Sequence, residues 1–140
     1  MKGWKEMPYK KTLAARRLEI ADNQLSPSYW AEIGKELIDK EYPHLHNVED
    51  VCLRLGISAG HFRDVFRMAY GITPKLYLVR VKVERAMELL KDRLVMVYDV
   101  AMKVGIPHRN VFEKTFKKFV GVTPSEYRRL SSSGEFEARK

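Results

Sequence analysis

The chain has 140 residues, a net charge of +8 and a single cysteine. This length fits one domain, because domains usually have about 100 to 200 residues. Its longest apolar runs, such as residues 94–98, are far too short to span a bilayer, and lysines near the start interrupt any leader sequence. One cysteine cannot form an internal disulfide, which fits a reducing compartment. We therefore expect a cytoplasmic protein that does not act at a membrane, with a basic surface suited to a polyanion.

Residues 1–28 are predicted to form a linker or an accessory helix. Residues 9–23 place three apolar side chains on one stripe, and Leu25-Ser26-Pro27 separates this stripe from the rest of the chain. Three roles stay open for this segment. It is a linker from a preceding sensor or receiver domain, an arm that contacts nucleic acid through Arg16 and Arg17, or a helix that binds another protein.

The next predicted helix covers Tyr29 to about Lys40. Its apolar residues recur with the helical period and so form one face, which is expected to pack on the neighbouring helices of the chain; they are Trp30, Ile33, Leu37 and Ile38.

An internal repeat dominates the rest of the chain, because residues 48–77 recur with changes as residues 97–127. The first matches, Val48/Val97 to Ile57/Ile106, are 49 residues apart, whereas those from Phe62/Phe112 to Tyr77/Tyr127 are 50 apart. One residue is therefore inserted between Ile106 and Phe112. Such a duplication indicates two copies of one small module.

Each copy is predicted to be two short helices joined by a tight turn. In the first copy Asn47 and Ser58 are suited to cap the helices, and Gly56 and Gly71 are suited to end them. The second helix of each copy has a helical apolar stripe; the stripes are Phe62, Val65, Phe66 and Ala69, then Phe112, Thr115, Phe116 and Phe119. Together with the Thr-Pro pair after each copy, this is a helix-turn-helix plan.

A longer helix, residues 74–91, is predicted to join the two copies. Its expected apolar stripe is Leu76, Val79, Val83, Ala86, Met87 and Leu90. At about 1.5 Å per residue this rod is about 27 Å long, comparable with the roughly 34 Å that separates major-groove sites on one face of DNA. After the second copy, residues 131–140 are polar and expected to be a flexible tail.

These features resemble the DNA-binding domain of the AraC/XylS family of bacterial transcription regulators. The residues that carry the resemblance are Asp99-Val100-Ala101, Gly105-Ile106, Val111-Phe112, Phe116-Lys117-Lys118-Phe119, Gly121 and residues 123–129, together with the degenerate first copy. The resemblance implies an all-α, duplicated, homeodomain-like fold over residues 29–130. Its first motif covers about 47–72, the linker helix about 74–91 and the second motif about 96–121.

The resemblance also implies which residues read bases. These are His108, Arg109, Asn110, Val111 and Lys114 in the second copy, and Gly60, Arg63 and Asp64 in the first. Arginine can bond O6 and N7 of guanine together, and asparagine can do the same for adenine. Gly60 has no side chain, and phosphate repels Asp64, so the second copy is expected to carry most of the discrimination.

Other basic residues are expected to contact phosphates, which position a protein on DNA without specifying a sequence. They are Lys117, Lys118, Arg67, Arg80, Lys82, Arg128 and Arg129. The charge distribution favours the second copy as the one that attracts phosphates more strongly. Residues 107–130 have six Lys or Arg against two Asp or Glu, whereas residues 29–72 have five against seven.

The expected function is therefore a sequence-specific double-stranded DNA-binding transcription regulator that reads two adjacent major-groove segments. One molecule is expected to suffice for one site, with RNA polymerase as a further partner. No enzyme activity and no cofactor are expected, since the sequence contains no enzyme signature. No metal is expected either, since His44 and His46 have no further ligand at metal-binding spacing. The main alternative is a helical protein-interaction adaptor with a basic face. A DNA-repair methyltransferase fused to such a domain is disfavoured, because Cys52 is expected to be buried.

Overall fold

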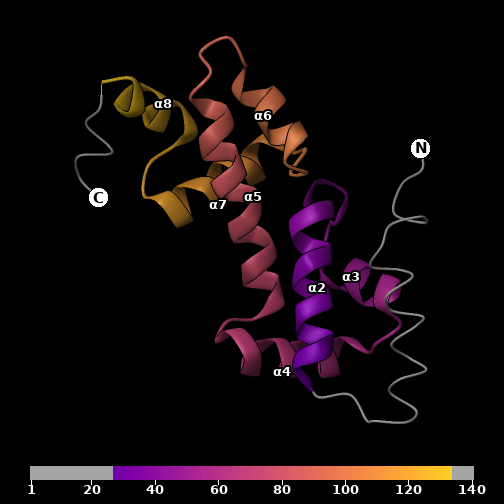
Figure 1. Ribbon diagram of the computed structural model, residues 1–140. Coiled ribbons are helices and arrows are strands. Elements are labelled where there is room, and N and C mark those ends of the chain that lie inside the picture. The colour runs from indigo at the N-terminus through magenta and orange to yellow at the C-terminus, as the bar shows by residue number, and fades with distance from the viewer. Residues whose placement is uncertain (1–26, 134–140) are drawn as a thin grey trace. The chain divides into compact units, whose positions relative to one another are not determined.

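The computed structural model describes residues 27–133, and within them it is entirely helical (Figure 1). The helices are α2 (Pro27–Glu41), the short 3-10 helix η2 (Tyr42–His44), α3 (Val48–Leu55), α4 (Ala59–Tyr70), α5 (Pro74–Leu90), α6 (Val97–Lys103), α7 (Arg109–Val120) and α8 (Pro124–Ser133). The predicted all-α fold is confirmed. None of these helices is both long and apolar enough to cross a membrane. The helix predicted at residues 9–23, with Arg16 and Arg17, lies outside the described residues, as do residues 134–140.

The described chain divides into two compact units. The first contains residues 27–40 and 47–76, and the second contains residues 41–46 and 77–133. The boundary falls inside α5, whose first residues belong to the first unit. Residues 41–46 lie between two segments of the first unit in sequence and yet belong to the second, which the sequence pattern did not predict.

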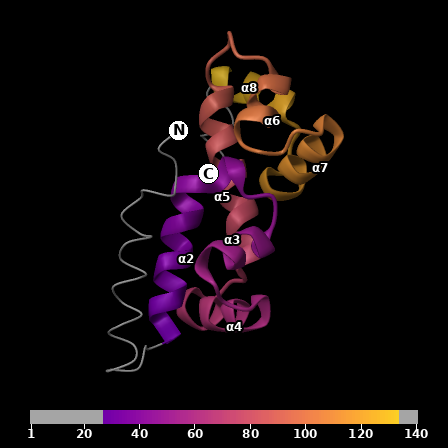
Figure 2. The ribbon, with the colours of Figure 1, turned by 90° about the vertical axis from the view of Figure 1, so that its right-hand side faces the viewer.

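In the first unit α3 and α4 pack beside α2, as both ribbon views show (Figures 1 and 2). The core comes from all three helices and includes Ile33, Leu37, Leu55, Phe62 and Phe66. The predicted caps are present: Asn47 Oδ1 accepts a hydrogen bond from the backbone N of Asp50, and Ser58 Oγ accepts one from His61. The backbone of α2 lies close against the ring of Phe62, because a Cβ placed on Gly34 would be 2.3 Å from that ring.

The second unit is built around the longer part of α5 and the helices α6, α7 and α8. Its core cluster consists of Val83, Ala86, Leu90, Val100, Ala101, Val104, Phe112, Phe116 and Tyr127. The rings of Phe116 and Tyr127 meet edge to face with centroids 5.7 Å apart, which joins α8 to α7. Edge-to-face contact is a favoured geometry for aromatic pairs.

Several predicted burials are wrong. Phe119 is 38% exposed and Ala69 is exposed, although both lie on the apolar stripe of their helices. Both sit in the last helical turn before a glycine, where no neighbouring element covers them enough to bury them. In α5, Leu76 is 41% exposed, whereas Leu78 and Lys82 are buried. The first three residues of the predicted flexible tail, 131–133, instead form the last turn of α8.

Candidate nucleic-acid interface

The turn of the second motif is held by a glycine and by a segment far away in sequence. Gly105 has a φ of +84°, in the left-handed region that glycine favours. A Cβ at this position would lie 2.5 Å from the carbonyl oxygen of Pro43, so the close approach of residues 41–46 also requires glycine. The two motifs differ in the number of residues between this glycine and the second helix of the motif. Two residues, 57 and 58, precede α4, whereas three residues, 106–108, precede α7.

Lys82 fixes the same turn from the side of α5. Its side chain is only 4% exposed, and Nζ donates to the carbonyl oxygens of Leu45 at 2.6 Å and Gly105 at 3.1 Å. The assignment of Lys82 to a DNA phosphate is therefore wrong, because its ammonium is buried and bonded to backbone. A sequence signal existed, since Lys82 lies on the apolar face, four residues after Leu78 and three after Val79.

The polar face of α7 is exposed as expected. Phe112 and Phe116 are fully buried, and the opposite face carries Arg109, Asn110, Val111, Lys114, Lys117 and Lys118, all exposed, with His108 exposed just before the helix. Side chains on the first turns of such a helix can reach base edges in a major groove. The residues of α7 that were predicted to read bases and those that were predicted to contact phosphates are therefore all accessible on this helix.

The N-terminus of α7 departs from the usual rules of helix stability. His108 occupies the N-cap position without making a side-chain capping bond, and the cationic Arg109 is the first helical residue. Positive charge at a helix N-terminus is unfavourable, because the helix dipole is positive there. In α4, by contrast, Ser58 caps the helix and Ala59 begins it. Departures of this kind are expected at functional sites, where another requirement outweighs helix stability.

Arg109 has one partner on its own helix. Its Nε donates to Oε2 of Glu113 at 3.0 Å, and both side chains keep part of their surface in solvent. Glu113 was not among the residues predicted to act at the site. The spacing of four residues between opposite charges was the signal that could have indicated this pair.

The face of α4 that the sequence predicted to read bases is exposed but chemically poor. Gly60, Arg63, Asp64 and Arg67 are all exposed, and no atom lies within 4 Å of a Cβ built on Gly60. With a glycine and a carboxylate on this face, α4 offers fewer donors to a polyanion than α7 does.

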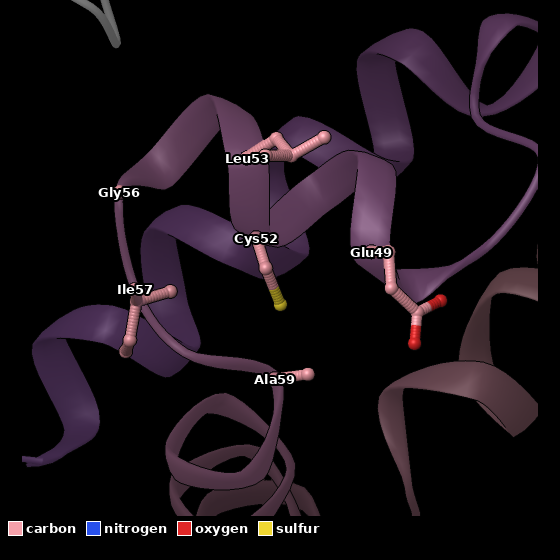
Figure 3. Close-up of a pocket in the computed structure, with 6 residues that line it drawn as sticks. All are labelled: Glu49, Cys52, Leu53, Gly56, Ile57 and Ala59. Carbon is pink, nitrogen blue, oxygen red and sulfur yellow. The ribbon is translucent and has the colours of Figure 1, made fainter.

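An open apolar hollow of about 390 Å³ lies beside the start of α4 (Figure 3). Its lining includes Cys52, Ile57 and Ala59, with Leu53 81% exposed and the Glu49 carboxylate close by. Cys52 itself is only 6% exposed, as the sequence predicted. Burial raises the pKa of the Cys52 thiol, the charge of Glu49 raises it further, and Arg63 partly opposes this. A thiol with a raised pKa is a poor nucleophile at neutral pH.

The remaining basic residues divide into two groups. Arg80 and Arg129 are exposed and accessible, although Arg80 also pairs with Glu84 at 3.4 Å. Arg128 instead donates from Nε to the carbonyl oxygen of Leu90 at 2.9 Å, and from Nη2 to the carbonyl oxygens of Asp92 and Val95. Its guanidinium therefore holds the end of α5 and the loop after it. The assignment of Arg128 to a phosphate is wrong for this reason.

Helix α8 begins with a reciprocal cap. The backbone N of Thr123 donates to Glu126 Oε1 at 3.0 Å, and the backbone N of Glu126 donates to Thr123 Oγ1 at 3.2 Å. Backbone and side-chain hydrogen bonds from Thr123 lower the pKa of the Glu126 carboxyl. After the first motif only half of this cap exists: the backbone N of Leu76 donates to Thr73 Oγ1 at 3.2 Å, and Leu76 stands where Glu126 does.

Comparison with known proteins agrees with this arrangement. The family model of a helix-turn-helix domain matches residues 51–130. The Msm operon regulatory protein of Streptococcus mutans is 26% identical over 110 residues, which cover 79% of this chain and 40% of that protein. The bifunctional transcriptional activator/DNA repair enzyme AdaA of Bacillus subtilis is 29% identical over 123 residues, covering 86% of this chain and 57% of that protein.

Solved structures show the same similarity. The C-terminal domain of AraT, a response regulator from Geobacillus stearothermophilus, has a TM-score of 0.69 and 28% sequence identity. The match covers 77% of this chain and 88% of that one. The chain is thus similar to nearly the whole of an isolated domain, whereas it spans only 40% and 57% of the two full-length relatives above.

Proposed function

The chain belongs to the AraC/XylS family of helix-turn-helix regulators, and we propose that it acts as a bacterial transcription regulator that binds double-stranded DNA sequence-specifically. The family match supports binding to DNA, and the names of the relatives support regulation of transcription. Because the chain spans only part of these relatives, the activity of the whole protein is part of the proposal.

The reading end of α7 is the observation that carries this proposal. There an uncapped helix N-terminus, a cation at the first helical position and an exposed basic face occur together. The arrangement is unfavourable for an isolated helix, but it suits a polyanion, since the free N–H groups, the helix dipole and the side chains all favour negative charge. A neutral or basic protein partner would give the helix no such compensation.

The role of each residue is proposed from its chemistry and position. In this proposal Arg109, Asn110 and Lys114 contact base edges, His108 and Val111 flank them, and the second motif carries most of the discrimination. In the first motif Arg63 and Asp64 have reading positions, and Gly60 contributes close approach only. The phosphate contacts are Lys117, Lys118, Arg67, Arg80 and Arg129, since Lys82 and Arg128 are engaged within the protein.

We further propose that one molecule occupies two adjacent major-groove segments. Two copies of the motif within one chain support this, because regulators with one motif read paired half-sites by dimerising. RNA polymerase is the proposed protein partner and the cytoplasm the proposed location, as for a bacterial regulator that acts on the chromosome. We propose binding without catalysis; the burial of Cys52 argues against the one alternative that needs a reactive thiol, a DNA-repair methyltransferase.

Selection of bound sequences from random double-stranded DNA tests the proposal directly. We expect a defined motif, a footprint that spans about two major-groove segments, and one protein molecule per site. Recovery of no preferred sequence, or affinity that does not change with salt, would contradict the proposal and favour the protein-interaction adaptor. An obligatory dimer on one short site would contradict the single-molecule part alone.

A further inference from the structure

The Arg109–Glu113 pair differs from an ordinary surface ion pair in where it stands. The bond from Arg109 Nε to Glu113 Oε2 is 3.0 Å long, and the side chains are 58% and 37% exposed. It joins the first and second turns of α7, the helix that reads bases in the proposed function. Removing a positive charge from this position would improve the stability of the isolated helix, so helix stability does not explain the arginine.

Nor does helix stability explain the glutamate well. In (i, i+4) pairs on a helix the favourable order puts the acidic residue first, whereas here the arginine comes first. A carboxylate on a DNA-facing helix also weakens attraction to phosphates. Glu113 is therefore unfavourable for general DNA binding, which points to an effect on one specific contact.

The geometry of the bond suggests that effect. Glu113 engages the guanidinium through Nε. In the planar guanidinium one N–H of each terminal nitrogen points along the end opposite Nε, so that pair of donors is not used by this bond. Guanine presents two neighbouring acceptors, O6 and N7, in the major groove, and a pair of parallel donors matches them. An arginine fixed at Nε loses less side-chain freedom when it binds, because its orientation is already set.

We propose that Glu113 is a positioning residue that orients Arg109 for a guanine and so sharpens the preference at one base pair. This inference rests on the proposed function. The carboxylate does not touch the base; it holds the guanidinium in the bidentate orientation and disfavours competing contacts of Arg109 with phosphate.

The first motif lacks this device. At the equivalent positions it has Ala59 in place of Arg109 and Arg63 in place of Glu113. The proposed orientation of an arginine by a carboxylate one turn later therefore belongs to the second motif alone. This agrees with the expectation that the second motif discriminates more between sequences.

The experiment measures discrimination, which a structural role would not change selectively. Binding of the chain and of Glu113→Gln, Arg109→Ala and the double variant is measured on the selected site, on its single-base variants and on unrelated DNA. Glu88→Gln is the matched control, because Glu88 pairs with Arg85 at 3.1 Å on the exposed face of α5. The temperature of unfolding is recorded for every variant.

We expect Glu113→Gln to reduce discrimination at one guanine about two- to fivefold, the range of an exposed ion pair, while binding to unrelated DNA stays equal or becomes tighter. In the Arg109→Ala background the same substitution should change nothing further. The Glu88→Gln variant should keep the full discrimination of the unmodified chain.

Three results would overturn the inference. Glu113→Gln could keep full discrimination; it could reduce discrimination equally with Arg109 absent, which would mean that Glu113 reads a base itself; or it could weaken all DNA binding in parallel with a lower temperature of unfolding. If the unmodified chain shows no sequence preference, the proposed function fails as well, and that result is distinct from the other three.

Discussion

The ammonium of Lys82 lies 3.1 Å from the carbonyl oxygen of Gly105, so a buried lysine of α5 holds the turn of the second helix-turn-helix motif. The same nitrogen donates to Leu45, which brings residues 41–46 against this turn. A lysine that satisfies two backbone acceptors is part of the scaffold on which α7 is presented.

Replacing Lys82 with methionine should therefore destabilise the second unit. The substitution keeps most of the apolar stem but leaves the carbonyls of Leu45 and Gly105 without their donor. We expect a loss of about 1 to 3 kcal/mol in the free energy of unfolding, measured by urea denaturation. Arg80→Met, on the exposed side of α5, is the control and should change stability little. Equal stability of the two variants would show that the bonds of Lys82 contribute nothing.

Gly34→Ala should destabilise the first unit. The new Cβ would lie 2.3 Å from Cε1 of Phe62, whose ring is fully buried and has little room to move. We expect a cost of about 1 to 3 kcal/mol, as for other overpacked cores, from thermal or chemical denaturation. Gly60→Ala is the matched control, because open space surrounds that position; it should be neutral or stabilise α4 by up to about 1 kcal/mol.

Arg109→Ala should weaken binding to the preferred site by about 1 to 3 kcal/mol and relax the preference at one base pair, because a bidentate guanine contact is lost. Competition binding with single-base variants of the site measures both effects. Alanine variants of Arg63 and Asp64 provide the comparison from the first motif. If they change the sequence preference more than Arg109→Ala does, discrimination belongs to the first motif instead.

Binding should depend strongly on salt. With Lys117, Lys118, Arg67, Arg80 and Arg129 on phosphates, the slope of log K against log salt should be about −4 to −5, since each contact contributes about −0.9. Lys117→Ala should make the slope shallower by about one unit and weaken binding to specific and unrelated DNA alike. Arg54→Ala, on the supporting helix α3, should change the slope less. A slope that Lys117→Ala leaves unchanged would remove this residue from the interface.

The cap of α8 should make stability depend on pH through Glu126. Its pKa is lower in the folded chain than its ordinary value, so its contribution is fully present above the unfolded pKa, about 4.3 for glutamate. The contribution is then lost as pH falls through the folded value. We expect the stability difference between the unmodified chain and Glu126→Gln to be largest near neutral pH and to shrink in acid, as measured by denaturation at several pH values. A difference that stays constant down to about pH 3 would contradict this.

The sequence by itself determined the duplicated helical fold and the outward face of α7. Caps such as Asn47 and Ser58, and turns at Gly56 and Gly105, act through bonds and dihedral angles within a few residues, so local patterns reveal them. The helical period likewise separates Phe112 and Phe116 from the exposed residues between them. Repetition of these signals at nearly constant spacing made the double motif readable.

Only the tertiary structure decided which basic side chains are accessible to a ligand and which ones instead bond backbone carbonyls within the protein. Lys82 lies on the apolar face of its predicted helix, but the sequence does not say which groups its ammonium meets. Lys82 and Arg128 bond carbonyls that are 37 and 38 residues away in the chain, those of Leu45 and Leu90. The exposure of Phe119 and the place of residues 41–46 in the second unit also depend on long-range packing. Local propensity cannot specify such contacts, because whether a cation is satisfied by backbone or left for a ligand depends on what the fold brings beside it.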